Sequence, residues 1–180
     1  MKWMAILAIL SSLAMAEAQV TLSRRALVPV TTDIDKKTYA AVDLPFDAYK
    51  PLFKKAEEIA AQKLDSRGEA HMTILTPPEI MRIDGKVRAQ LLAELKQATA
   101  TEKIKAVCIG RGKAEVKGKL EWTYFVVVEA PAIKALREKY GLKDFYPHVT
   151  LGFTKRDLHF EDGVRKDKDS CVTDVTVTAD

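Results

Sequence analysis

Two of the three histidines lie in the same short pattern, a His-x-Thr motif set among apolar residues. The first motif is His71-Met72-Thr73 and the second is His148-Val149-Thr150. Side chains of an extended strand alternate between its faces, so the histidine and threonine of each motif project to one side, about 6 to 7 Å apart. We therefore expect two strands that each present a polar pair on one face and anchor it in the core with the other.

Two such strands facing one cleft would supply acid–base chemistry for a phosphodiester. Opening a cyclic phosphate needs a base that deprotonates water on one side of phosphorus and an acid that protonates the departing ribose oxygen on the other. Histidine titrates near neutrality and suits both tasks, so we expect His71 and His148 to be the catalytic pair. The hydroxyls of Thr73 and Thr150 are expected to donate to the phosphate oxygens where charge accumulates. The sequence leaves open which histidine is the base.

One motif of this kind would be weak evidence. Threonine is common in strands, and a lone histidine on a strand is more often a structural residue. Two copies in matching apolar frames, each following a helix of similar size, favour the catalytic interpretation.

Short strands and helices alternate around the motifs. We expect strands at residues 37–44, 69–75, 104–110 and 119–129, and helices that begin at Pro51, after Asp84-Gly85 and at Pro131. Residues 172–178 alternate valine and threonine and are expected to form either an edge strand or a poorly ordered end. The order of helix followed by histidine strand occurs twice, which predicts a duplicated αβ unit folded as two related lobes.

The two motifs, together with the segment 146–154, resemble the paired signatures of the 2H phosphoesterases, and most closely those of the Swiss-army-knife or RNA-repair-like branch. The resemblance covers residues 36–160 in element order and is residue-specific only in the two strands. It implies an α+β bilobal fold of duplicated αβ units, with two antiparallel sheets flanking a central cleft and both histidines facing that cleft. It also implies activity without a metal, but no particular substrate.

The third histidine, His159, lies two residues after Asp157. The resemblance gives it a role near the phosphate or base, and the alternative is an exposed loop residue. Zinc ligation is disfavoured because no two histidines have the short or i, i+4 spacing of zinc ligands. We expect no metal and no other cofactor.

Residues 1–18 have the pattern of a cleaved export signal, with Lys2 ahead of an apolar stretch and small residues near Ala18. The stretch is shorter than the roughly 20 residues that span a membrane, although an uncleaved anchor remains the alternative. We therefore expect residues 19–180 to form the mature domain, secreted or periplasmic and free of the membrane once the signal is cleaved.

Length and charge set further limits. A chain of this size buries enough surface for one compact domain, and we expect a monomer. The net charge of +4 and the pI of about 9.0 favour anionic partners without the concentrated basic stripe of a dedicated nucleic-acid binder.

Cys108 and Cys171 are the only cysteines. In an exported protein they can form a disulfide, and the alternative is two separate thiols.

Several aromatic and basic residues are candidates for binding a base or RNA. Unstacked bases can lie on aromatic rings, and the candidates are Trp122, Tyr124, Tyr146 and Phe153. Trp122 and Tyr124 share a strand face with valines, which favours a core role for both. A basic patch surrounds three glycines and is either an RNA guide or, more in keeping with its composition, a solvated hairpin: Arg111, Lys113, Lys117 and Lys119.

The sequence thus predicts an exported phosphoesterase that acts on the 2',3'-cyclic phosphate of RNA ends or cyclic nucleotides. The alternative from another class is a noncatalytic protein that holds a nucleotide or RNA end in the same cleft. A structural envelope protein with incidental histidines is a third possibility.

Overall fold

The computed structural model describes residues 20–27, 29, 31–33, 39–142 and 145–179. The predicted signal at residues 1–18 lies outside the described residues. Within the described part of the chain, no helix has both the length and the apolar character needed to cross a membrane.

Eight strands follow one another in a single hydrogen-bonded order, β1-β8-β5-β6-β7-β4-β3-β2. Their bounds are β1 (Val20–Ser23), β2 (Thr31–Asp33), β3 (Ala40–Asp43), β4 (His71–Leu75), β5 (Lys105–Val116), β6 (Lys119–Glu129), β7 (His148–Phe153) and β8 (Cys171–Thr178). All neighbours are antiparallel except β1 and β8, which are parallel. The predicted final strand is β8, and it lies between β1 and β5 rather than at the edge.

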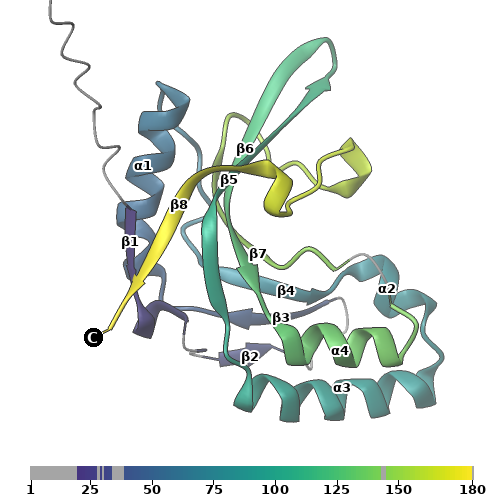
Figure 1. Cartoon of the computed structure of the whole chain (residues 1–180). Helices are drawn as coiled ribbons and strands as arrows, with labels where there is room; N and C mark the ends of the chain where they lie inside the picture. The colour runs from purple at the N-terminus through teal and green to yellow at the C-terminus, as the bar shows by residue number, and fades with distance from the viewer. Residues whose placement is uncertain (1–19, 28, 30, 34–38, 143–144, 180) are drawn as a thin grey trace, which may run out of the picture.

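The predicted pair of separate sheets is corrected by this order, because β4 and β7 lie side by side and connect the two halves. Only Met72 and Val149 pair across that joint. In Figure 1, strands β2, β3 and β4 run horizontally, whereas β5 and β6 run upright and β8 runs obliquely beside them. Both residues have fully buried apolar side chains, so the two histidine strands pair at a position whose side chains point into the core. The chain is therefore α+β, as expected, but its strands form one continuous order rather than two sheets.

The helices begin and end at residues that favour termini. Helix α1 (Lys50–Ala60) has Pro51 in its first turn, and α3 (Gly85–Thr101) is capped by Asp84, whose side chain accepts from the Lys86 N–H at 3.0 Å. Helix α4 (Pro131–Lys139) is followed by Gly141 at φ +73°. These three helices were predicted.

The short helix α2 (Pro77–Arg82) was not predicted, because its two prolines were interpreted as a break. Thr76 and Glu79 form a capping box at its start: the Glu79 side chain accepts from the Thr76 N–H at 2.8 Å. Proline in the first turn of a helix loses no hydrogen bond, so Pro77 is compatible with this beginning.

The hairpin of β5 and β6 extends away from the rest of the sheet (Figure 1). Its turn residues Lys117 and Gly118 have φ of 51° and 74°, the backbone of a two-residue turn that matches strand twist. Arg111 and Lys113 lie over the Trp122 ring, 5.2 and 5.5 Å from its centroid. The basic patch is thus a hairpin surface with two of its cations placed on an aromatic ring.

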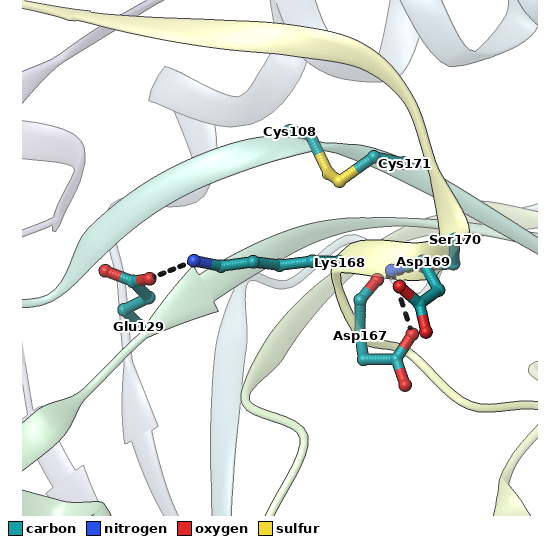
Figure 2. Close-up of a disulfide and its surroundings, with 7 residues drawn as sticks. All are labelled: Cys108, Glu129, Asp167, Lys168, Asp169, Ser170 and Cys171. Carbon is teal, nitrogen blue, oxygen red and sulfur yellow. Dashed lines mark hydrogen bonds and ion pairs between the residues drawn. A yellow bond between two sulfur atoms is a disulfide. The ribbon is translucent and has the colours of Figure 1, made fainter.

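Cys108 and Cys171 form a disulfide with a Cα–Cα distance of 5.7 Å, which resolves the alternatives left by the sequence (Figure 2). The bond joins β5 to the start of β8 and packs with Phe125 and Val127. Beside it, Lys168 and Glu129 form an ion pair at 2.5 Å. The C-terminal end of the loop between β7 and β8 is therefore fixed to the sheet.

Two glycines of β5 make room for that same loop. A Cβ at Gly112 would lie 2.3 Å from a methyl carbon of Val164, and one at Gly110 would lie 2.5 Å from the Phe125 ring. The Gly-x-Gly sequence here serves packing between a strand and a loop.

Candidate active site

Both His-x-Thr motifs line one cavity of about 560 Å³. His71 and Thr73 come from β4, and His148 and Thr150 come from β7. The other polar or aromatic residues that line it include Arg67, Glu69, Arg137, Tyr146, Asp157, His159, Phe160 and Lys166. The structure therefore brings all four predicted site residues together.

The strand period explains this placement. Met72, Ile74, Val149 and Leu151 are buried, while the histidines and threonines between them are partly exposed. Extending the antiparallel pairing of Met72 with Val149 places His71 across from Thr150 and His148 across from Thr73. Each histidine thus lies beside the threonine of the other motif.

His148 is held as a neutral ring with its reactive nitrogen free to accept. Its Nδ1 lies 2.8 Å from the Tyr146 carbonyl oxygen, which can only accept, so Nδ1 donates. Burial lowers the pKa of His148 well below its ordinary value, and the nearby Lys166 charge lowers it further. The edge of the Phe125 ring packs against the imidazole, with 5.9 Å between centroids. A neutral imidazole protonated on Nδ1 offers Nε2 as a base.

His71 has a different neighbour. Its Nδ1 lies 3.3 Å from Oε1 of Glu69, an exposed carboxylate. A carboxylate at this distance can accept from the Nδ1–H and so orients the ring. The two histidines therefore differ in the partner of Nδ1, which is a backbone carbonyl for His148 and a carboxylate for His71.

Asp157 is the centre of a buried polar network in the wall of the cavity. Its carboxylate accepts from the hydroxyl of Thr123 at 2.7 Å, from the hydroxyl of Thr150 at 2.9 Å and from Nζ of Lys166 at 2.8 Å. Its side chain is 2% exposed and that of Lys166 is 3% exposed. Burial alone would raise the pKa of Asp157, but the charge and hydrogen bond of Lys166 outweigh it and hold the pKa below its usual range.

Two further groups approach the same carboxylate from the cavity side. The Arg67 guanidinium lies 3.7 Å and the His159 Nε2 lies 3.9 Å from Oδ2 of Asp157. Burial lowers the pKa of His159, and Asp157 partly opposes that shift. His159 thus lines the cavity with a side chain that is half exposed.

A pair of aromatic rings lines the cavity. Tyr146 and Phe160 are stacked with 6.3 Å between centroids, and the Arg165 guanidinium lies 5.3 Å from the Tyr146 centroid. Phe160 is 61% exposed. Of the aromatic candidates named from the sequence, Tyr146 lies at the cavity, whereas Trp122, Tyr124 and Phe153 are not among its lining residues.

Arg137 and Glu79 build another wall. The Arg137 guanidinium donates to Oε1 of Glu79 at 2.6 Å and to the Ile74 carbonyl at 2.5 Å, and it lies 4.6 Å from the Phe145 ring centroid. This buried pair ties α4 to α2 and to the end of β4, which carries the first motif.

Sequence reasoning missed most of these supporting residues. Lys166 and Arg165 lie in a charged run that is typical of a solvated loop, and Arg137 lies on a helix whose apolar face was the stronger signal. Asp157 carried one usable signal, its i, i+2 spacing to His159. Among the described residues no group of three or more His, Cys, Asp or Glu is placed to hold a metal ion.

Comparison with known proteins gives one match. A family model described as Swiss Army Knife, 2H phosphoesterase domain matches residues 38–159. Neither the curated proteins nor the solved structures give a match. The matched segment contains both motifs and Asp157, and it ends before Lys166.

Proposed function

The chain belongs to the 2H phosphoesterases, in the Swiss Army Knife group, and on that premise we propose that it hydrolyses 2',3'-cyclic phosphates of nucleotides or RNA ends without a metal. The observation that carries the proposal is the convergence of His71 and His148, from two distant strands, on one cavity. A volume of about 560 Å³ is within the range of small-molecule sites and suits a nucleotide.

In the proposed mechanism His148 is the base and His71 is the acid. Nε2 of neutral His148 takes a proton from water as the water oxygen bonds to phosphorus. The bond from phosphorus to one ribose oxygen breaks, and protonated His71, oriented by Glu69, gives its proton to that oxygen. The products are a phosphate monoester and a free ribose hydroxyl. The Thr73 hydroxyl is proposed to donate to a phosphate oxygen that gains charge.

The aromatic pair supports a substrate that carries a base. A nucleobase stacks on aromatic rings with little dependence on its identity. Phe160 presents an exposed ring at the cavity, and Tyr146 behind it fixes its orientation. A cyclic phosphate in the histidine cleft would thus have its base within reach of Phe160.

Export fits the same proposal. Disulfides persist in oxidising compartments, and the chain holds one between Cys108 and Cys171. We propose that the mature domain acts as a secreted or periplasmic monomer after cleavage near Ala18.

The test is hydrolysis of 2',3'-cyclic mononucleotides by the wild type, His71→Ala and His148→Ala. We expect each variant to lose at least about 10²-fold in kcat/KM, because each removes one proton-transfer group. Binding of a nucleoside monophosphate and the thermal unfolding midpoint show whether each variant remains folded with an intact cleft. Hydrolysis that survives both substitutions would refute the mechanism.

The alternative of a noncatalytic nucleotide or RNA-end binder predicts affinity without turnover in the wild type. The structural alternative predicts that no nucleotide raises the unfolding temperature. Either outcome would replace the proposal.

A further inference from the structure

The two threonines of the motifs are not equivalent in this structure. The Thr150 hydroxyl has one proton, and it donates that proton to Oδ2 of Asp157 at 2.9 Å. An ionised carboxylate can only accept, so the direction of this bond is fixed. Among the described residues the Thr73 hydroxyl has no hydrogen-bond partner. Thr73 is therefore available to donate to a bound phosphate, whereas Thr150 is already used.

Two cations, Lys166 and Arg67, lie beside Thr150 in the cavity wall. The Thr150 hydroxyl itself has no proton left to donate there. Nζ of Lys166 lies 2.8 Å from Oδ1 of Asp157 and 3.4 Å from Oγ1 of Thr150, and it lies 5.3 Å from the Phe125 ring centroid. The Arg67 guanidinium approaches the other carboxylate oxygen. Lys166, Arg67 and Asp157 all line the cavity.

The charge at this place is unbalanced. Two cations share one carboxylate, which leaves one positive charge in excess. Of the other carboxylates that line the cavity, Glu79 pairs with Arg137, Glu69 lies beside His71, and Glu161 is exposed. A cyclic phosphate is a diester with a single negative charge, and the excess cation at Asp157 is placed to attract it. In a buried setting an opposite charge is attracted far more strongly than in water.

We infer that Lys166 and Arg67 bind the substrate phosphate on the β7 side of the cleft, in the position expected of the Thr150 hydroxyl, and that Asp157 with Thr150 holds Lys166 in place. This inference rests on the proposed function for the identity of the substrate. It assigns the phosphate to Thr73 on one side and to two cations on the other. Lys166 lies beyond the segment that matches the family.

Calorimetric titration with adenosine 3'-monophosphate and with inorganic phosphate tests the inference without any turnover. We expect Lys166→Met and Arg67→Gln each to weaken binding about tenfold or more, and Thr73→Val to weaken it several-fold. Thr150→Val should weaken binding less than Lys166→Met does. The matched control is Arg156→Gln: Arg156 is 46% exposed against 43% for Arg67, lies in the same loop as Asp157, pairs with Asp162 and does not line the cavity. Its affinity should stay within twofold of the wild type.

The dependence of affinity on salt separates contact from structure. Loss of a cation that touches the phosphate lowers the slope of affinity against ionic strength, whereas a merely structural defect does not. If Lys166→Met does not fold, because it leaves the Asp157 carboxylate unpaired, Arg67→Gln against Arg156→Gln decides.

Equal losses in Arg67→Gln and Arg156→Gln, a larger loss in Thr150→Val than in Lys166→Met, or no phosphate binding by the wild type would overturn the inference. Weakened phosphate binding in a protein that hydrolyses no cyclic phosphate would uphold the inference and refute the proposed function. Normal hydrolysis and unchanged phosphate binding in Lys166→Met would refute the inference and leave the proposed function standing.

Discussion

Replacing Asp157 by asparagine is expected to destabilise the protein strongly, because it removes the only carboxylate within hydrogen-bond distance of buried Lys166 among the described residues. Asparagine keeps the size of the side chain but not its charge. Leaving a buried ion without its partner typically costs about 3 to 5 kcal/mol. That is a large fraction of the roughly 5 to 15 kcal/mol that stabilises a whole domain.

The cost has a ceiling that depends on pH. Lys166 can give up its proton instead of remaining charged and unpaired, and at pH 7 this costs about 4.6 kcal/mol, about 1.36 kcal/mol for each pH unit below the lysine pKa of about 10.4. The unfolded chain then holds one proton more than the folded variant. The stability of the variant relative to the wild type must therefore rise with pH, by up to about 2.7 kcal/mol between pH 7 and pH 9.

Urea unfolding at pH 7 and pH 9 measures both quantities. Asp162→Asn is the control, because Asp162 is another aspartate of this loop with an arginine partner that is nearly half exposed, and its loss should cost at most about 1 kcal/mol. A loss below about 1 kcal/mol for Asp157→Asn at pH 7, or a deficit that does not shrink at pH 9, would refute the description of this pair as a buried ion pair.

Three other perturbations give separate tests. The pKa of His148 is depressed, so the stability gained from its neutral form is present above about pH 6.5 and is lost as the pH falls, by at most about 1.4 kcal/mol per pH unit. Urea unfolding at pH 7 and pH 5 should therefore show a smaller drop in the free energy of unfolding for His148→Asn than for the wild type. An equal drop would contradict this. Arg137→Met should lower the free energy of unfolding by about 3 to 5 kcal/mol, because it leaves Glu79 without its partner. Lys139→Met removes an exposed pair with Glu94 and should cost about 1 kcal/mol or less. Similar unfolding midpoints for the two variants would count against a structural role of Arg137. Reducing the disulfide should cost about 2 to 5 kcal/mol in thermal unfolding, and an unchanged midpoint would show that the loop is held by packing alone.

Local patterns in the sequence predicted the placement of the motifs. Alternation along a strand is a property of the backbone, so the cavity-facing His71 and His148 and the buried Met72 and Val149 followed from spacing alone. The helices with proline near their first residue were equally local. Thr76 and Glu79 also carry a readable capping signal for α2, which the prediction did not use.

Features that depend on contacts between segments far apart in the sequence could not be predicted. Thr123, Asp157 and Lys166 meet only because β6 and the loop after β7 lie together, and nothing in a charged run marks one lysine as buried. The single order of strands depends on one pairing at the joint of β4 and β7, which has no signature in either strand.

That joint gives two core residues an influence on the chemistry. His71 and His148 come from opposite sides of a joint where Met72 pairs with Val149, and Val149 also pairs with Val126 on its other side. The backbone pairing at this joint sets how far apart the two histidine strands lie, and the core packing of Met72 and Val149 holds that pairing in place. A change of volume at Val149 is therefore a way to perturb the separation of the two histidines from a residue that is buried in the core and does not line the cavity.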